Sequence, residues 1–161
     1  MGNSKSIGRI LTVVSIVATL CVFAVIGASN YTLATSLTES LMGLLEEPPE
    51  GEGPLGMQMI IDPSGGVTLT LPFTVQNPGL MEVSVTLNLT LLSVDGEVIA
   101  EGSDSKRIPL GSSDELVVSL YVSPEDAVMF ETSPPIWRLL FECRTLFDLV
   151  GIAVSAEMGG V

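Results

Sequence analysis

The sequence predicts a mainly β protein in which a single N-terminal transmembrane helix precedes an antiparallel β-sandwich or barrel with one short helix. Three observations support this prediction. An uncharged apolar run lies near the N-terminus, and the mean hydropathy of the 161-residue chain is +0.56, which is high for a wholly soluble domain. Beyond residue 57, apolar residues alternate with polar ones, as in half-buried strands. Gly and Pro punctuate these segments at short intervals, as in all-β domains.

The apolar run covers residues 10–28 and reads ILTVVSIVATLCVFAVIGA. About 20 such residues in a helix cross the ~30 Å apolar core of a bilayer. Lys5 and Arg9 precede the run, and the next charged residue after it is Glu39. Because positive flanks stay in the cytoplasm, we expect residues 1–9 to form a cytoplasmic flank. Everything after the run is then extracytoplasmic, in a single-pass protein of the cell membrane.

A cleavable signal peptide is the main alternative to this anchor. The apolar region of a signal peptide spans about 7–15 residues and ends at small residues that suit the cleavage site. The run here is longer, and Ile26-Gly27-Ala28 matches a cleavage site poorly. We therefore favour an uncleaved signal-anchor.

Helical spacing continues beyond the run. Leucines recur at helical intervals up to residue 45, and residues 29–45 contain no Pro. We expect a helical stalk at 29–45 that continues the membrane helix, so that one helix extends from about Ile7 to Leu45. Its apolar face is expected to dock on the chain's own domain or on a protein partner; alternatively, the helix packs into an assembly of copies. The residues of this face are Leu33, Leu37 and Leu41.

Residues 46–56 read EEPPEGEGPLG. A mixture of Pro, Gly and Glu breaks a helix and cannot form a core. We expect a linker here, with its carboxylates solvated, so that the extracytoplasmic β domain covers residues 57–161.

Alternation predicts about six strands in this domain. The clearest are Val67–Val75, Val83–Leu91 and Leu116–Val122, with shorter ones at 57–61, 98–100 and 151–156. Pro72 indicates a sheet edge or a bulge, because proline cannot donate to a strand ladder. Asp95-Gly96 is a signal for a two-residue hairpin turn.

Two later segments depart from alternation. Pro124–Glu131 follows Ser123, a good helix cap, and is predicted to be a short helix. Ile136–Leu149 is apolar but carries four charges, which argues against a second membrane span. It is predicted to be either a strand or a helix, with Trp137 and Phe141 in the core.

Composition excludes several classes of function. The chain has 6 Lys+Arg against 19 Asp+Glu, a net charge of −13 and no His. This acidity argues against nucleic-acid binding, and the lack of His removes the commonest general base and zinc ligand. Cys21 lies in the apolar run and Cys143 stands alone, so no thiolate site is expected. We therefore predict no enzyme activity, no catalytic residue, no cofactor and no metal site.

Two sequons for N-glycosylation begin at Asn30 and Asn88. Asn88 lies on the predicted polar face of its strand, where a glycan fits. Asn30 is expected close to the bilayer, where access is poorer.

Three motifs follow one another in the β domain. VQNPG ends a strand at Val75–Gly79, DGEVIAEG forms a hairpin at Asp95–Gly102, and IPLGSSDELVVSLYV spans Ile108–Val122. This layout resembles the group-two late embryogenesis abundant domain, also called the water-stress and hypersensitive-response (WHy) domain. The residues that carry the resemblance are Asn77, Pro78, Asp95, Gly96 and Gly102.

The resemblance covers roughly residues 57–160 and implies a small immunoglobulin-like or fibronectin-like sandwich with one helix. The family offers no catalytic residues to transfer. Its members, archaeal ones included, are often tethered by an N-terminal membrane helix, and roles in stress protection and interaction are suggested for them. An archaeal origin and a stress-related role are expectations from this resemblance alone.

We therefore expect a membrane-anchored extracytoplasmic binding, protective or structural module without catalysis, such as an accessory subunit of a membrane or envelope complex. The alternative is a structural subunit of an archaeal surface filament, since pilin-like proteins also join a long apolar N-terminal helix to a β-sandwich. The pilin processing motif is poor here, because Gly8 lies between Ile7 and Arg9. A basic residue before that Gly and an apolar one after it would be expected.

Overall fold

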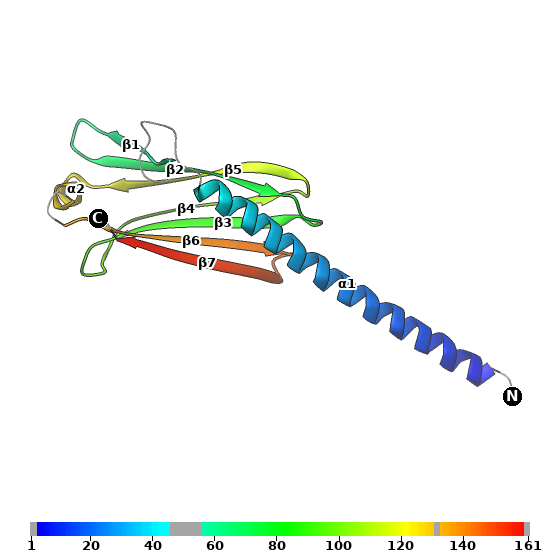
Figure 1. The fold of residues 1–161 in the computed structure, drawn as a ribbon. Coiled ribbons are helices and arrows are strands. Elements are labelled where there is room, and N and C mark those ends of the chain that lie inside the picture. Colours follow the sequence, from blue (N-terminus) through cyan, green and yellow to red (C-terminus); the bar gives the residue numbers. More distant parts are fainter. Residues whose placement is uncertain (1–2, 46–55, 131–132, 160–161) are drawn as a thin grey trace.

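The computed structural model describes residues 3–45, 56–130 and 133–159; within the first segment, side chains are described for 14–40. Two antiparallel sheets face each other, and one long helix lies against them and projects far beyond one end (Figure 1). The predicted mainly β fold with an N-terminal helix is therefore confirmed. The expected linker at 46–56 lies outside the described residues, apart from Gly56.

The helix α1 (Asn3–Leu45) is a single element of 43 residues, so the predicted continuity of membrane run and stalk is confirmed. It begins four residues earlier than expected. By length and composition alone, its stretch Val14–Ser40 is long and apolar enough to cross a membrane.

Seven strands make up the two sheets in the described part of the chain. The smaller sheet has the order β1-β2-β5, with β1 (Gln58–Ile61), β2 (Val67–Asn77) and β5 (Ser112–Val122). The larger sheet has the order β4-β3-β6-β7, with β3 (Val83–Leu92), β4 (Val98–Ile108), β6 (Ile136–Thr145) and β7 (Val150–Gly159). The short helix α2 (Pro124–Met129) follows β5 and is capped by Ser123 as predicted. Glu131, its expected last residue, lies outside the described part.

The core lies between the sheets and is built from the alternating faces that the sequence predicts. The inward residues of β3, from Val83 to Leu91, are all at most 1% exposed. Phe73 and Phe141, one from each sheet, meet edge to face with ring centroids 5.5 Å apart. Trp137 is half-buried and packs against the same core.

Pro72 occupies a local edge. The pairing of β1 with β2 ends at Thr70, so at Pro72 the strand has β5 on one side and no described strand on the other. The missing N–H therefore removes no ladder hydrogen bond. Of the two alternatives, the edge is confirmed, and the β2–β5 register shows no bulge.

The prediction of a two-residue turn between β3 and β4 is wrong, because the loop of this hairpin is longer. Leu92 pairs with Val98, which leaves residues 93–97 as the loop. The Ser93 N–H donates to the Glu97 oxygen at 2.8 Å, and Gly96 adopts a φ of 83°. Asp95-Gly96 marks the turn correctly, but the glycine closes a wider loop.

The segment left open between strand and helix is a strand, β6, followed by a tight turn into β7. In that turn Leu146, Phe147 and Asp148 have φ values of 53°, 54° and 67°. Residues with a Cβ rarely adopt this left-handed conformation. No sequence pattern predicts three of them in succession. The strand count was low by one because the pattern of residues 136–149 did not distinguish a strand from a helix.

Candidate functional site

The second half of α1 docks on the sandwich through a line of small polar residues interleaved with leucines. Buried positions recur every three or four residues between Ser29 and Ser40. We call this line the docking seam. It consists of Ser29, Thr32, Leu33, Ser36, Leu37 and Ser40. Small side chains allow the helix backbone to come close to the sheets.

The leucine face predicted from the sequence belongs to this seam. Leu33 is 0% exposed and Leu37 is half-buried, and both pack against the hydrophobic core. Docking on the chain's own domain is thus confirmed for these two residues. The Leu33 side chain is thereby covered by the chain's own domain, and binding of a partner or self-assembly through this face stays a prediction. The side chain of Leu41 lies outside the described residues.

Asn77, at the end of β2, joins the β2–β3 connection to the end of β4 although it is only 1% exposed. Its Nδ2 donates to the backbone oxygens of Met81 at 2.8 Å, Ile108 at 3.0 Å and Pro109 at 3.1 Å. An amide has two such hydrogens, so three acceptors share them. The β2–β3 connection is thereby joined to the end of β4.

The other end of the Asn77 amide reaches the helix. Its Oδ1 accepts hydrogen bonds from the Ser36 hydroxyl at 3.1 Å and from the Gly79 N–H at 3.1 Å. Thr32 adds a second link, since its Oγ1 accepts from the Leu80 N–H at 2.9 Å. The docking seam is therefore fixed by directional hydrogen bonds as well as by packing.

Gly79 is the point of closest approach between α1 and the β2–β3 connection. A Cβ built there would lie 2.5 Å from Thr32 Cγ2 and 2.8 Å from Thr32 Cα. Because the second contact is with backbone, a side-chain rotation cannot relieve it. The glycine of the NPG motif is thus required by the docked helix.

The Ser40 hydroxyl at the end of the docking seam is buried and has no hydrogen-bond partner among the described residues. A buried hydroxyl without a partner lowers stability. It is the weak point of an otherwise satisfied interface.

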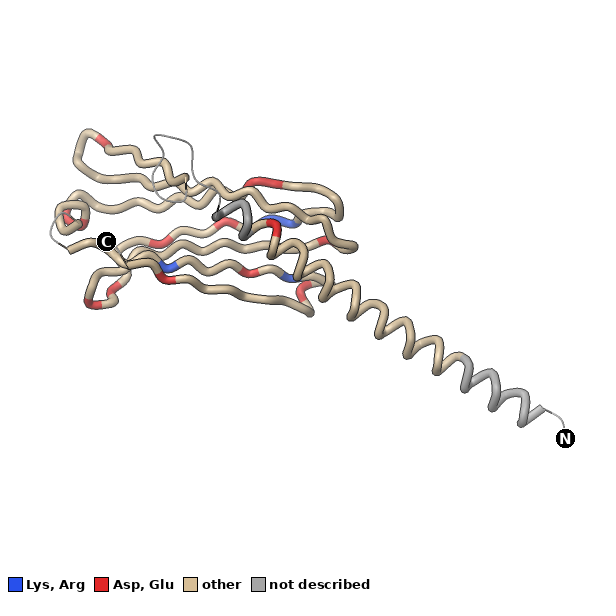
Figure 2. Tube along the Cα trace, viewed as in Figure 1, with Lys and Arg blue, Asp and Glu red and all other residues tan. Residues whose placement is uncertain are grey.

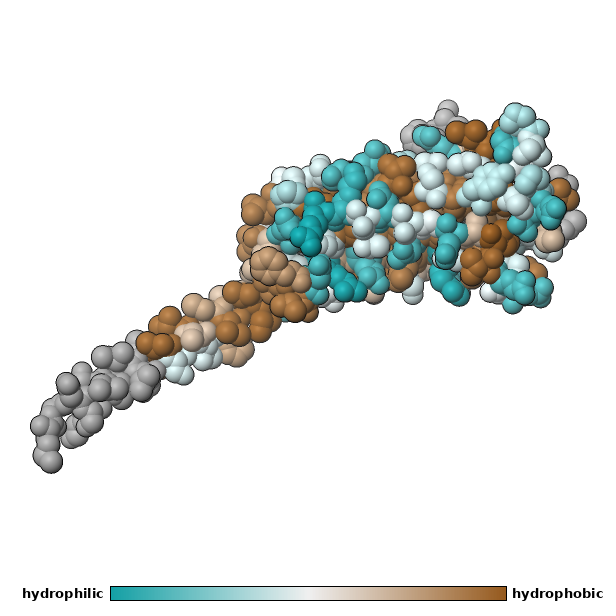
Figure 3. Space-filling view, turned by 180° about the vertical axis from the view of Figure 1, so that it is seen from behind, coloured by the Kyte–Doolittle hydropathy of each residue, from teal (hydrophilic) through white to brown (hydrophobic). Residues whose placement is uncertain are grey.

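The first half of α1 contrasts with the docked half. Every side chain described from Val14 to Gly27 is exposed, with Leu20 at 63% and Phe23 at 68%. Figure 3 shows this apolar surface as a brown rod that leaves the domain. Figure 2 shows no charged position along it. Lys5 and Arg9 belong to the same helix, but their side chains lie outside the described part.

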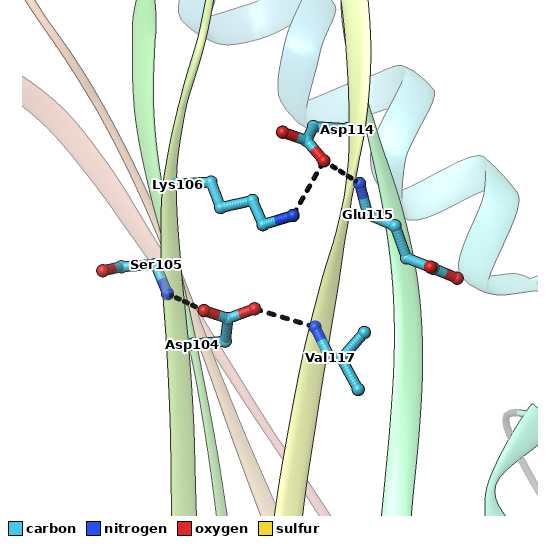
Figure 4. A network of polar contacts seen from close by, with 6 residues as sticks. All are labelled: Asp104, Ser105, Lys106, Asp114, Glu115 and Val117. Carbon is cyan, nitrogen blue, oxygen red and sulfur yellow. Dashed lines mark hydrogen bonds and ion pairs between the residues drawn. The ribbon is translucent and has the colours of Figure 1, made fainter.

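The opposite side of the sandwich is closed where β4 and β5 come together. Asp104 on β4 accepts from the Val117 N–H on β5 at 2.8 Å, and Lys106 Nζ lies 2.8 Å from the Asp114 carboxylate (Figure 4). Gly102 allows this closeness, since a Cβ there would lie 2.4 Å from the Ser119 oxygen. The hydrogen bond between Lys106 and Asp114 raises the pKa of the amine and lowers the pKa of the carboxyl.

The residues that carry the family resemblance do not converge on one site. Asn77 and Pro78 lie at the end of the sandwich where α1 leaves it, whereas Asp95 and Gly96 lie in the hairpin at the other end (Figure 1). Gly102 faces β5 between the two ends. These positions shape the fold in three separate places, and only Asn77 contacts α1.

The two sequons differ in their surroundings. Asn88 is half-buried on the outer face of β3, between Ser103 on β4 and Leu140 on β6. Asn30 is exposed on α1, directly after the first residue of the docking seam.

The cysteines are separated as the sequence predicts. Cys21 is exposed on the first half of α1, whereas Cys143 is buried in the core. Burial raises the pKa of the Cys143 thiol to about 11. Among the described residues, no three His, Cys, Asp or Glu side chains lie together in a way that could hold a metal ion.

Sequence reasoning found Asn77 but missed its partner Ser36 and the other hydroxyl residues of the docking seam. The signal was present: Ser29, Thr32, Ser36 and Ser40 are spaced like the leucines and share their helical face. The apolar pattern alone does not show this buried face, because a Ser/Thr face in a helix is normally taken as solvent-facing.

No protein-family model and no curated protein matches the sequence. Several solved structures resemble the fold. A putative beta-galactosidase from Bacteroides fragilis has a TM-score of 0.46 at 15% identity, covering 65% of this chain and 15% of that chain. A Bacteroides uniformis beta-glucuronidase has a TM-score of 0.43 at 14% identity, covering 64% of this chain and 12% of that one. A protein from Archaeoglobus fulgidus has a TM-score of 0.46 at 14% identity, covering 65% and 91%.

This chain therefore spans less than one sixth of the length of those two enzymes. A structural likeness at such low sequence identity concerns the fold alone, so no activity is transferred from either enzyme.

Proposed function

We propose that this chain is a membrane-anchored extracytoplasmic module without catalysis, which serves a binding, protective or structural role at the cell surface. One observation carries the proposal. An uncharged apolar helical stretch, Val14–Gly27, is exposed along its whole length and protrudes from a domain that has its own hydrophobic core. Exposed apolar surface on that scale calls for a partner outside the chain, and a lipid bilayer suits a rod of this length.

The orientation is part of the proposal. Lys5 and Arg9 at the start of α1 favour a cytoplasmic N-terminus, which places the sandwich outside. The resemblance of residues 57–160 to the WHy domain supports a protective or interaction role. The docking seam adds that the sandwich is held close against its anchor rather than tethered by a free chain.

Alkaline carbonate extraction of membranes, combined with protease treatment of intact cells, tests the anchor. We expect the full chain to stay in the membrane pellet and its sandwich to be accessible from outside. Release into the carbonate supernatant would overturn the proposal.

The filament alternative is distinguished by the mature N-terminus and by shearing. Mass spectrometry that finds an intact Met1 or Gly2 supports the anchor, whereas a chain that starts at Arg9 supports a pilin. Sheared fibres that contain the chain would support the same alternative.

A further inference from the structure

The apolar run of α1 stops at the point where the helix reaches the end of the sandwich. The run ends at Ala28, and the docking seam starts at the next residue, Ser29. Residues 10–28 extend about 28 Å at 1.5 Å per residue, close to the ~30 Å of a bilayer core. If α1 crosses a membrane, as the proposed function holds, no spacer separates the sandwich from the lipid surface.

Two connections of the sandwich lie at the level where the run ends. The β2–β3 connection contacts the first turn of the docking seam, since Ser29 Oγ lies 3.6 Å from Met81 Sδ. The β6–β7 turn lies beside it, because Met81 and Phe147 line the same open hollow of about 290 Å³. Figure 1 shows both connections next to α1, with α2 and the β3–β4 hairpin at the far end.

These two connections present large apolar side chains outward. Phe147 is 93% exposed and Leu149 is 83% exposed, the highest values among the large apolar residues that the structure describes. Leu80 on the β2–β3 connection is 62% exposed. Tyr31, on the outer side of α1 three residues beyond the run, is 54% exposed, and tyrosine favours membrane–water interfaces. Brown surface continues from the helix onto this end of the domain (Figure 3).

The charges near these tips are largely paired. Asp148 lies between Phe147 and Leu149, and its carboxylate is 3.7 Å from Arg107 Nη2. The Glu142 carboxylate is 3.2 Å from Arg144 Nη2. Glu82 also lines the hollow. Ion pairing reduces the cost of bringing carboxylates close to an apolar phase.

We propose that this end of the sandwich is a lipid-contacting surface, in which Phe147, Leu149 and Leu80 enter the interface of the same bilayer that α1 crosses. The inference rests on the proposed function. Phe147 and Leu149, in and directly after the left-handed part of the β6–β7 turn, are directed away from the core. Contact at these tips and along α1 together fixes the tilt of the sandwich over the membrane.

Fluorescence quenching in vesicles tests the proposal with the full chain. A Cys21→Ala background leaves only the buried Cys143, and single cysteines are added as Phe147→Cys, Val94→Cys or Leu20→Cys. Val94, 59% exposed in the β3–β4 hairpin, is the matched control at the far end. Each variant is labelled with an environment-sensitive dye and reconstituted in phosphatidylcholine vesicles. The lipids carry a doxyl quencher either just below the headgroup or deep in the acyl chains, and the background without an added cysteine gives the blank.

We expect the shallow quencher to lower the Phe147→Cys signal roughly twofold or more, because interfacial side chains lie about 5–10 Å deep. The Val94→Cys signal should stay unchanged. Equal behaviour of the two labels would overturn the inference.

The Leu20→Cys label separates failure of the inference from failure of the proposed function. Deep quenching at position 20 without quenching at 147 leaves the anchor intact and removes the lipid-contacting surface. Absence of quenching at position 20 removes the anchor as well. A blue shift at 147 that depends on protein concentration and not on the quencher would identify a second copy of the chain as the partner, which also overturns the inference.

Discussion

The two halves of α1 are continuous in backbone but opposite in surroundings. From Val14 to Gly27 every side chain is exposed and none is charged, whereas Ser29, Thr32 and Ser36 in the second half are 0% exposed. The more apolar half is thus the free one, and the buried half is lined by hydroxyls.

This inversion agrees with the proposal that the first half of α1 lies in a membrane. A helix that docks on a polar sheet end needs hydrogen bonds and small side chains, because buried backbone groups of the connection must be satisfied. A helix that lies in lipid needs only apolar bulk, since its own backbone is already hydrogen-bonded.

The largest expected effect comes from charging the free half. Replacing Val17 and Leu20 by lysine should abolish carbonate-resistant membrane association, because each lysine near the centre of a span costs about 2.5–3.5 kcal/mol. Ala34→Lys with Thr38→Lys is the matched control, as both residues are exposed on the docked half. Should both double variants remain in the membrane pellet, the free half would not be the anchor.

The next largest effect concerns the hub of the docked half. Asn77→Ala removes five hydrogen bonds of one buried side chain and leaves several carbonyl oxygens without partners. We expect a loss of roughly 3 kcal/mol in the free energy of unfolding, measured by denaturant titration in detergent. Asn88→Ala, on the outer face of β3, should change it by less than about 0.5 kcal/mol. Similar losses of unfolding free energy for the two variants would contradict the central role of Asn77.

Cys21 lies on the free half of α1, whereas Cys143 lies in the core of the sandwich and gives a pH limit for its stability. The thiol pKa is 9.0 when unperturbed and about 11 when Cys143 is buried. Between these values the unfolded chain releases a proton that the folded chain retains, so stability falls as the pH rises. Two pKa units correspond to about 2–3 kcal/mol.

Unfolding titrations from pH 8 to pH 11 measure this loss. Cys143→Val should flatten the decline, whereas Cys21→Val should leave it in place. A decline that persists in Cys143→Val would assign it to another group.

A smaller effect is expected where the docked half meets the NPG turn. Gly79→Ala should cost about 1–3 kcal/mol through overpacking, because the new methyl would overlap Thr32 Cγ2 and Cα. Thr32→Ser in the same chain removes the methyl contact but keeps the backbone one, so it should restore only part of the stability. Full rescue would mean that the helix backbone is not in close contact, and thermal unfolding of the three variants distinguishes these outcomes.

The elements of this molecule that have a regular sequence pattern could be predicted from the sequence. The alternating faces of β2, β3 and β5, the continuous helix and the cap of α2 all follow from local patterns. The β6 strand was ambiguous because Ile136 and Leu140 lie among the charged residues of its outer face and weaken the alternation. Three left-handed residues in the β6–β7 turn carry no composition signal.

The candidate site was harder to predict because it depends on tertiary contacts. Asn77 was singled out by resemblance, but its bonds to Ser36 and to the end of β4 join residues 41 and 31 positions away. The shared face with the leucines indicates that Ser36 is buried, but it does not indicate that Asn77 is its partner. The exposed tips Phe147 and Leu149 were likewise indistinguishable in sequence from core residues.

The smallest predicted effect tests the one unsatisfied group of the docking seam. Ser40→Ala removes a buried hydroxyl that has no partner among the described residues, so the variant should be as stable as the natural chain or more stable by up to about 1 kcal/mol. Ser36→Ala is the matched control at the previous turn of the same face, and it should lower stability because it leaves Asn77 Oδ1 with one donor fewer. Unfolding midpoints of the two variants should therefore move in opposite directions. A loss of stability in Ser40→Ala comparable to that in Ser36→Ala would show that Ser40 has a partner in the folded protein, and the docked half would then be satisfied along its whole length.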